Sequence, residues 1–335
     1  MNDLEVRELR YFVAVAEELN FSRAAGRLEM AQPPLSRAIS QLEKRLGVQL
    51  FERNTRRVAL TAAGLTLLEE ARSALDAMSA AARRTRRAAS AASTLVATAK
   101  PGVATGLLQQ IVDSYTALSG TPRVEILVSG YREQADMVRD GRADVALLSS
   151  PYDERGLDAE PLTTERRVAA LPVGHDLAHR SVVRCRDLHG EPMPQWPATS
   201  PAERAYWSAR DGEFWANASS HPQPDVPVEG PVVSDVMQLL EVVGLGQAVA
   251  LIPQSVAESN PRADIAYRPV RDASPYTLMI AWPEGSRARS VAMFVRTAID
   301  LTAETEREDS TCSSKSQEAS HVRRRVYARR EPGRR

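Results

Sequence analysis

The residues best suited to chemical recognition lie on one face of a predicted helix near the N-terminus. In a helix that begins near Pro34, four apolar residues share one face: Leu35, Ile39, Leu42 and Leu46. The opposite face carries short hydroxyls, an amide and cations: Ser36, Arg37, Ser40, Gln41 and Lys44. In the major groove of DNA, arginine pairs with guanine and glutamine with adenine. Taken alone, the pattern fits a DNA-reading helix and an ordinary solvated amphipathic helix equally well, and the order of the surrounding elements favours the first.

Other short elements surround that helix. Apolar spacing predicts a helix over Val6–Glu18, followed by a short helix over Arg23–Leu28 with Ser22 as its N-cap. Two prolines at the start of the third helix fit its first turn, where a backbone donor has no partner inside the helix. Two β-like segments, 49–51 and 57–60, then form a basic hairpin. This order is typical of a helix-turn-helix followed by a wing.

A long helix is predicted from Thr61, its N-cap, to about Ser93, because the segment is rich in alanine and free of proline. Residues spaced by four and three form a heptad seam along it: Leu67, Ala71, Ala74, Met78, Ala81 and Thr85. Such a seam favours pairing with a second helix, antiparallel or parallel. The alternative is that it packs on its own chain.

After residue 93 the pattern changes to alternating strands and helices. The segments in order are strand 95–99, helix 107–118, strand 124–128, helix 133–139 and strand 145–148. This order predicts a parallel sheet flanked by helices, and a second such set follows Arg167. We therefore expect two α/β lobes with a ligand cleft between them, since such sheets bind ligands at the carboxyl ends of their strands. The fold class is α/β with an all-α N-terminal part.

The formal charge is zero, with 43 lysines and arginines against 43 aspartates and glutamates. The charges are unevenly placed, with a net charge of +4 over residues 1–94, −7 over 95–302 and +3 over 303–335. The neutral total therefore does not exclude a nucleic-acid partner. Two cysteines in 335 residues indicate a reducing cytoplasm, and no apolar run has the length that a membrane span requires.

No constellation for catalysis or metal binding stands out. His175 and His179 have the spacing of a zinc site but lack the glutamate that the motif needs, and Gly244–Gly246 lacks the third glycine of a dinucleotide site. Cys185 lies beside two arginines, but Cys312 is in the polar C-terminal segment, so a structural thiol is favoured over a redox sensor. We expect no enzyme, no metal and no cofactor.

Several N-terminal segments strongly resemble the LysR-type transcriptional regulators: 9–17, 20–25, 31–39, 42–43, 46–47, 50–53 and 60–64. The string Ala31-Gln32-Pro33-Pro34-Leu35-Ser36-Arg37 is the most distinctive of them. The resemblance is dense over about residues 4–66 and fainter through 300. It implies a winged helix-turn-helix, a dimerising linker helix and a two-lobed effector domain of the periplasmic-binding-protein type.

The resemblance also implies a DNA-binding domain over 1–62, a linker helix over 63–93 and an effector-binding domain over 94–302. Residues 303–335 have no counterpart in the family, and their composition, rich in serine, glutamate and arginine, predicts a disordered basic tail. Within the effector-binding domain, lobe I takes about 94–166 and 268–302, and lobe II about 167–267.

Carried over residue by residue, the resemblance implies a helix-turn-helix over Phe21–Ser40. Its DNA-facing residues are Ser22, Arg23, Gln32, Pro33, Pro34, Ser36, Arg37 and Gln41, with Arg53 and Arg56 on the wing. The double proline resembles a branch of the family whose members respond to small aromatic or carboxylate metabolites.

For the effector, the resemblance points to loops that meet in the cleft. The implied residues are Lys100, Pro101, Gly102, Val103, Ser129, Tyr131, Ser149, Trp196, Gly246 and Gln247. The family commonly has serine or threonine in the first of these loops, where this chain has Lys100. That cation either favours an anionic effector or faces solvent.

Together these features predict a cytoplasmic regulator that binds double-stranded promoter or operator DNA and a small anionic or aromatic effector. We expect it to form a homodimer or homotetramer and to act with RNA polymerase. The alternative is a solute-binding module whose N-terminal helices serve only for dimerisation.

Overall fold

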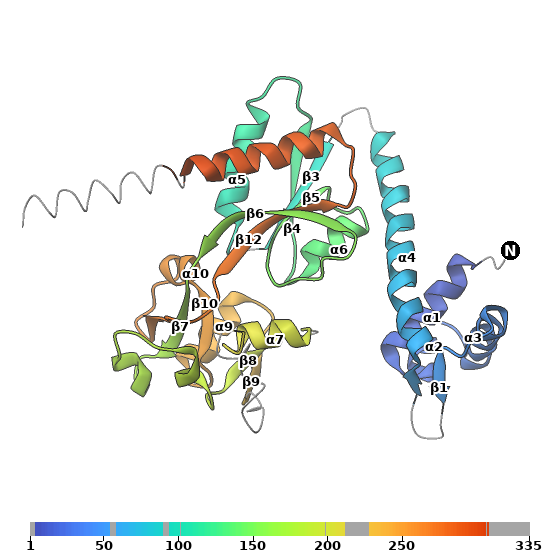
Figure 1. Cartoon of the computed structure of the whole chain (residues 1–335), viewed down its shortest axis with the longest axis horizontal. Helices are drawn as coiled ribbons and strands as arrows, with labels where there is room; N and C mark the ends of the chain where they lie inside the picture. Colours follow the sequence, from blue (N-terminus) through green and yellow to red (C-terminus); the bar gives the residue numbers. More distant parts are fainter. Residues whose placement is uncertain are drawn as a thin grey trace, which may run out of the picture.

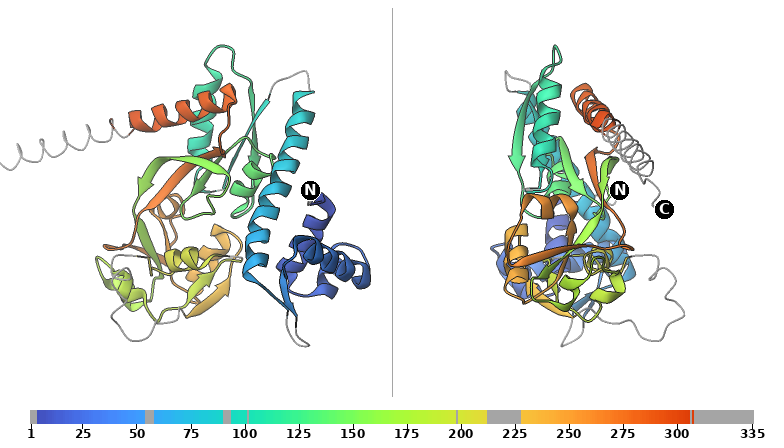
Figure 2. Two further views of the ribbon diagram at one scale, coloured as in Figure 1. Left: turned by 45° about the vertical axis from the view of Figure 1, so that its right-hand side comes forward. Right: turned by 90° about the vertical axis from the view of Figure 1, so that its left-hand side faces the viewer.

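The computed structural model describes residues 4–53, 58–89, 94–100, 102–197, 199–211, 228–305 and 307. A mainly helical N-terminal region is joined by one long helix to two α/β lobes (Figure 1). The long helix stands between the N-terminal region and the lobes, and a C-terminal helix over 289–305 lies across the first lobe (Figures 1 and 2). This helix continues past the predicted start of the tail at 303, whereas residues from 308 onward lie outside the described part.

The N-terminal region consists of α1 (Val6–Glu18), α2 (Phe21–Arg27), α3 (Gln32–Leu46) and the antiparallel hairpin of β1 (Phe51–Arg53) and β2 (Val58–Leu60). A single apolar cluster holds these elements together, and within it the rings of Phe12 and Phe51 have centroids 5.4 Å apart. The predicted apolar face of α3 is buried in this cluster through Leu35, Ile39 and Leu42. Each such side chain contributes about 1.5–3 kcal/mol when it leaves water.

Ser22 is not the N-cap of α2, contrary to the sequence prediction. The helix begins at Phe21, and the side chain of Asn20 accepts hydrogen bonds from the backbone N–H groups of Ser22 and Arg23 at 2.9 and 3.0 Å. Asparagine is among the strongest N-caps, and Ser22 lies inside the helix as one of the donors that it satisfies. The side chain of Ser22 is consequently free of a capping role and exposed.

Helix α4 (Ala62–Ala88) is capped by Thr61, whose hydroxyl accepts a hydrogen bond from the backbone of Gly64 at 3.0 Å, as predicted. It ends five residues before Ser93, the predicted end. Leu67 and Ala71 of the predicted seam pack into the N-terminal cluster. The rest of the seam is exposed along the second half of the helix: Ala74, Met78, Ala81 and Thr85.

One carboxylate fastens α4 to the helices of the N-terminal region. Glu17 of α1 accepts hydrogen bonds from Arg72 of α4 at 2.8 Å and from Arg27 of α2 at 2.7 Å. Burial by itself would raise the pKa of the Glu17 carboxyl, but the two guanidinium groups outweigh burial and hold that pKa below its ordinary value. The three helices are therefore linked by charge as well as by apolar packing.

Lobe I contains a five-stranded sheet in the order β4-β3-β5-β12-β6. Its strands are β3 (Thr94–Ala99), β4 (Arg123–Val128), β5 (Val145–Ser149), β6 (Leu157–Glu165) and β12 (Tyr276–Pro283). The predicted parallel pairing holds for β3, β4 and β5, while β12 runs antiparallel to β5 and β6. Strand β6 escaped prediction because Leu162 is its one fully buried residue, so the segment has no apolar run.

Helices cover both faces of this sheet. α5 (Thr105–Thr116) and the helix over 289–305 pack on one face, and α6 (Glu133–Arg139) packs on the other. Successive side chains of β3 point to opposite faces, so that Leu95 and Ala97 pack on the first face and Val96 packs on the second. α6 consequently lies between the sheet and α4 (Figure 1).

The main sheet of lobe II is antiparallel, which corrects the expected second parallel set. β7 (Arg167–Pro172) lies between β10 (Ala250–Pro253) and β11 (Ile265–Pro269) and runs opposite to both. β10 and β11 share a direction and are joined through α10 (Gln254–Ser259), so the crossover unit exists but β7 is inserted into it. β11 extends past residue 267, the predicted end of this lobe.

The remaining elements of lobe II are short. They are the 3₁₀ helices η1 (Asp176–His179) and η2 (Cys185–Leu188), the parallel pair β8 (Met193–Gln195) and β9 (Glu229–Val232), and helices α7 (Pro201–Trp207) and α9 (Val236–Gly244). The helix predicted over Ala202–Trp215 ends at Trp207, and residues 212–227 lie outside the described part. Among the described residues, no helix combines the length and apolar character that a bilayer crossing requires.

Arg167 holds together the two chain segments that cross between the lobes. Its fully buried guanidinium donates to the backbone oxygens of Ser274 and Tyr206, each at 2.6 Å, and pairs with Asp211 at 2.7 Å. The guanidinium carbon also lies 3.7 Å from the centroid of the Tyr206 ring. A buried guanidinium is tolerated when its donors are satisfied in this way.

We expect Gly64→Ala to destabilise the N-terminal region. A Cβ atom added there would lie 2.2 Å from the carbonyl oxygen of Leu50, which already accepts a hydrogen bond from the backbone of Thr61. Overpacking of this kind costs about 1–3 kcal/mol. Denaturant unfolding of the full chain measures the loss. Gly26→Ala is the matched control, because nothing lies within 4 Å of its added Cβ, and equal effects of the two substitutions would contradict the expectation.

Candidate functional site

The polar face of α3 is open in the folded chain. Gln32, Arg37 and Gln41 are exposed, and none of them forms a hydrogen bond or ion pair with another residue that the structure describes. Pro33 is also exposed, and Pro34, Ser36 and Ser40 are half-buried along the same helix. Ala31 stands at the N-cap position and has no side chain that can cap, and Pro33 and Pro34 have no N–H, so Gln32 carries the one backbone N–H among the first three residues of α3.

Contacts on the other side of α3 hold this face in place. Glu43 accepts hydrogen bonds from the backbone N–H groups of Leu50 and Phe51 at 3.0 and 3.2 Å, which ties α3 to the start of the hairpin. Arg45 forms an ion pair with Glu8 of α1. The helix therefore presents its polar side chains from a rigid support.

The other predicted DNA-facing residues differ in exposure and in their contacts within the chain. Ser22 and Arg23 are exposed, but the guanidinium of Arg23 donates to the backbone oxygen of Glu18 at 2.6 Å and pairs with its carboxylate at 3.3 Å. A contact from Arg23 to DNA would have to compete with these interactions. The side chain of Arg53 and all of Arg56 lie outside the described residues.

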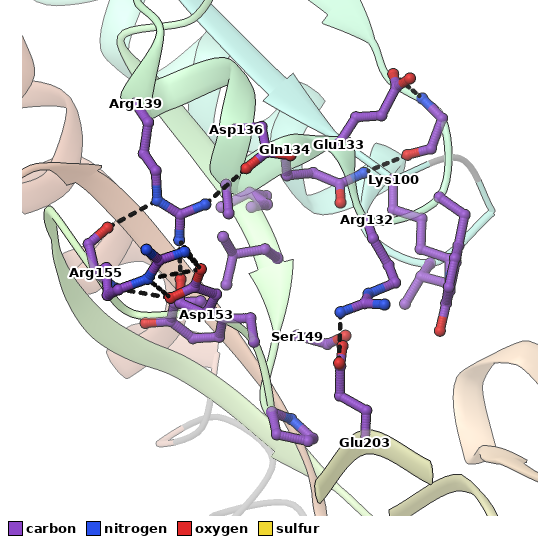
Figure 3. A pocket seen from close by; sticks show the side chains of 18 of the residues that line it. Lys100, Arg132, Glu133, Gln134, Asp136, Arg139, Ser149, Asp153, Arg155 and Glu203 are labelled. Carbon is purple, nitrogen blue, oxygen red and sulfur yellow. Dashed lines mark hydrogen bonds and ion pairs between the residues drawn. The ribbon is translucent and has the colours of Figure 1, made fainter. Parts of the chain in front are cut away.

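A cavity of about 810 Å³ opens between the two lobes and extends to α4. Four of the predicted effector residues line it: Lys100, Val103, Tyr131 and Ser149. Figure 3 shows Lys100, Arg132, Ser149 and Glu203 around one part of the cavity, with Asp136, Arg139, Asp153 and Arg155 around another part. The structure thus brings together loops that are far apart in the sequence.

Lys100 lies beside a stacked pair of aromatic rings. Tyr131 of lobe I and Trp196 of lobe II stack with centroids 4.1 Å apart and planes inclined by 16°. The Lys100 ammonium is 4.4 Å from the first centroid and 5.4 Å from the second. Lys100 has no carboxylate or hydrogen-bond partner within the described part of the chain. Burial lowers the pKa of this ammonium to about 8, so the site holds a cation that its own structure leaves unpaired.

A second contact between the lobes was not predicted. Arg132 of lobe I forms an ion pair with Glu203 of α7, whose carboxylate also accepts a hydrogen bond from the backbone of Ser200 at 2.9 Å. Arg132 adopts a left-handed backbone with φ of 65°, which a residue other than glycine seldom takes. The spacing Ser200-x-x-Glu203 could have identified Glu203 as a helix cap, but nothing local indicates its partner.

Tyr276 also lines the cavity, and the sequence did not predict this position. It is buried and lines the cavity together with Leu278, the residue of β12 that pairs directly with Ser149 of β5. Burial raises the pKa of its phenol to about 12, although a hydrogen bond with the Ser149 side chain acts in the opposite direction. Tyr276 is therefore a neutral hydrogen-bonding group in this wall at neutral pH.

Several predicted effector residues do not line the cavity. Ser129 is buried, and its hydroxyl is occupied by the backbone oxygen of Ala99 at 3.1 Å and the amide of Gln134 at 2.7 Å. Gly102 is exposed outside the lining, and Pro101 lies outside the described residues. Trp196 reaches the site through its stack on Tyr131.

Gly246 and Gln247 are also outside the lining. Both are exposed at the C-terminal end of α9, whereas the opposite end of that helix, next to Ser234, borders the cavity. At 1.5 Å per residue, the nine residues of α9 separate the two ends by about 13 Å.

Cys185 and His175, which the sequence analysis considered for redox and metal chemistry, have structural roles. Cys185 is buried, and burial followed by the charge of Asp272 raises the pKa of its thiol to about 12, which suppresses thiolate chemistry. His175 accepts a hydrogen bond from the backbone of Leu177 at 3.2 Å and caps η1. Among the described residues, no group of three or more histidine, cysteine or acidic side chains is arranged to hold a metal ion.

Comparison with known families agrees with this architecture. The family described as "Bacterial regulatory helix-turn-helix protein, lysR family" matches residues 6–65, and the "LysR substrate binding domain" matches residues 88–302. The chain belongs to the LysR family of transcriptional regulators. It is a DNA-binding regulator that combines a winged helix-turn-helix with an effector domain of the periplasmic-binding-protein type, which confirms the resemblance seen in the sequence.

Individual relatives cover most of the chain. The Hca operon transcriptional activator HcaR of Escherichia coli is 31% identical over 293 residues, which cover 87% of this chain and 96% of HcaR. The regulator BenM of Acinetobacter baylyi is 30% identical over 276 residues, covering 82% and 88% of the two chains. The crystal structure of a full-length BenM mutant aligns with a TM-score of 0.52 at 27% identity, covering 90% of this chain and 98% of BenM.

We expect Lys100→Met to raise the thermal unfolding midpoint at pH 7, because the fold then no longer confines an unpaired ammonium. The pKa of Lys100 is lower in the folded chain, about 8, than its ordinary value of 10.5. Below pH 8 both states carry the proton and the penalty is complete. Between pH 8 and 10.5 the folded state releases the proton first, so the wild type gains stability and the difference shrinks.

Differential scanning calorimetry of the two proteins from pH 7 to 10 measures this difference. Lys100→Arg is the control, because its guanidinium stays charged over the whole range. A difference between Lys100→Met and wild type that does not change with pH would show that confinement of the charge is not its cause.

Proposed function

We propose that this regulator reads its operator through the exposed face of α3. The observation that carries the proposal is the set of unoccupied side-chain donors and acceptors on Gln32, Arg37 and Gln41, held on a rigid helix. Arg37 and Gln41 suit base edges, while the hydroxyl of Ser36 suits a phosphate. Ser22, Arg23, Pro33, Pro34 and Ser36 complete the proposed contact surface, with Arg53 and Arg56 reaching the DNA from the wing.

We expect Arg37→Ala to weaken operator binding and to relax base preference at one position of the site. Loss of a bidentate contact to guanine costs about 1–3 kcal/mol, or roughly 5- to 150-fold in affinity. Gel-shift titration measures the loss on an operator selected from genomic fragments, at two salt concentrations. Arg10→Ala is the matched control, since Arg10 is an exposed arginine on α1.

Equal losses for Arg37→Ala and Arg10→Ala would contradict base reading by Arg37. A wild-type chain that retards no fragment specifically would support the alternative function, a solute-binding module that uses its N-terminal helices for dimerisation.

We further propose that the effector is a small anion with an aromatic or otherwise apolar body. Lys100 supplies an unpaired positive charge in a largely enclosed place, and the Tyr131–Trp196 stack supplies flat apolar surface beside it. Val103, Leu147 and Leu278 add apolar walls, and Ser149 adds a hydroxyl. An ammonium without an internal partner has most to gain from a ligand carboxylate, because that ligand provides the missing charge.

We expect benzoate to raise the unfolding midpoint of the wild type, and the isosteric neutral amide benzamide to have a much smaller effect. Lys100→Met should weaken benzoate binding about tenfold or more, since a hydrogen bond to a charged group contributes about 1.5–3 kcal/mol. Isothermal titration calorimetry measures the affinity. Equal binding of benzoate and benzamide, or unchanged binding by Lys100→Met, would contradict an anionic effector at Lys100.

The open half of α4 supports assembly of the regulator as a homodimer or homotetramer. Ala74, Met78 and Ala81 are exposed there and can seat a second copy of the helix. Such pairing would present two α3 helices to two half-sites of one operator. We propose that the assembly works at promoters in the cytoplasm together with RNA polymerase.

A further inference from the structure

The N-terminal end of α6 is part of the effector cavity. Tyr131 and Arg132, the two residues that reach across to lobe II, immediately precede this helix. Gln134 donates to the backbone oxygen of Gly130 at 2.9 Å, and Glu133 accepts from the backbone of Gly130 at 2.9 Å (Figure 3). The cavity loop and the first turn of α6 are therefore bound to each other.

The body of α6 is rigidly packed. Its residues Ala135, Met137 and Val138 are buried against the sheet of lobe I. On its outer side, Arg139 pairs with Asp136 and donates to the backbone oxygen of Arg155 at 2.7 Å. The seven residues of α6 span about 10 Å at 1.5 Å per residue, so a displacement at one end of the helix is carried over that distance.

The other end of α6 meets α4 almost backbone to backbone. Gly141, which follows the helix, has φ of +76°, and a Cβ atom built on it would lie 2.7 Å from the Cα atom of Ala80 in α4. Ala80 is itself buried in this contact, with 2% of its surface exposed. Arg87 of α4 donates to the backbone oxygen of Gly141 at 2.7 Å and pairs with Asp144 at 2.6 Å. No flexible side chain separates the two backbones.

We propose that α6 couples the effector cavity to the linker helix α4, with the Gly141–Ala80 contact as the point of transmission. The inference deepens the proposed function, on which its biological role rests. A ligand that changes how Tyr131 and Arg132 meet lobe II moves the start of α6. Because the far contact is between backbones, rotation of a side chain cannot absorb that movement, and α4 must respond.

Hydrogen exchange of the full chain tests this coupling without any ligand or DNA. Tyr131→Ala removes the stack on Trp196 and perturbs the cavity end of α6. We expect it to accelerate exchange of backbone amides in residues 76–88 of α4 by about threefold or more, through more frequent local opening. The same perturbation is then repeated in chains that also carry an alanine at a glycine of lobe I.

Gly141→Ala and Gly120→Ala form a matched pair for this purpose. Both glycines lie in lobe I with φ near +77°, so both alanines incur the same backbone strain, but nothing lies within 4 Å of a Cβ added at Gly120. We expect the effect of Tyr131→Ala on α4 to disappear in Gly141→Ala and to persist in Gly120→Ala. A second pair makes the same comparison from α4, with Arg87→Gln reducing the effect and the exposed neighbour Arg86→Gln preserving it.

An effect of Tyr131→Ala that is equally large in both members of each pair would overturn the proposal. So would the absence of any change in α4 when Tyr131→Ala is made in the wild type. If Gly141→Ala does not fold, the Arg87 and Arg86 pair decides the question. Failure to retard DNA or to bind benzoate would remove the proposed function and leave this exchange result standing, so the two failures are distinguishable.

Discussion

The buried guanidinium of Arg167 is the interaction on which the geometry of the two lobes depends. Two separate chain segments pass between the lobes, and without a common anchor each would bend independently. Arg167 binds the second crossing through Ser274 and lobe II through Tyr206 and Asp211, while belonging to the first crossing itself. Arg167 therefore anchors the chain segments that carry the cavity walls of both lobes. The Tyr131–Trp196 stack and the Arg132–Glu203 pair then set how closely the two walls approach.

The two surfaces proposed to recognise DNA and the effector use opposite electrostatic arrangements. On α3 the donors are exposed and solvated, and their value comes from rigid presentation to a polyanion of high charge density. In the cavity the charge of Lys100 is confined and unpaired, and its value comes from the poor solvation of the free site. The first arrangement suits discrimination among many sequences that bind with similar overall charge, and the second suits capture of a small anion at low concentration.

Sequence reasoning identified what depends on local pattern. The polar and apolar faces of α3 and the Thr61 cap follow from spacing, and the structure places them as predicted. For Lys100 the sequence left open whether it faces the cavity or solvent, and in the structure it lines the cavity. The contacts of Arg132 with Glu203 and of Gly141 with Ala80 join residues about 60–70 positions apart, and no local pattern encodes them. Ser129 and Gly246, also predicted near the effector, do not line the cavity, because burial of a hydroxyl and the direction in which α9 points are decided by tertiary packing.

The carboxylate of Glu17 gives α4 the character of a lever. It ties α1 and α2 to α4, and the Arg45–Glu8 ion pair and the shared apolar cluster tie α3 to α1, so α3 turns together with α4. The 27 residues of α4 span about 40 Å. A tilt of only about 5° at the lobe end would displace the other end by roughly 3.5 Å, close to the 3.4 Å rise of one base pair. A small tilt of α4 at lobe I would therefore displace α3 by a distance comparable to one base-pair step.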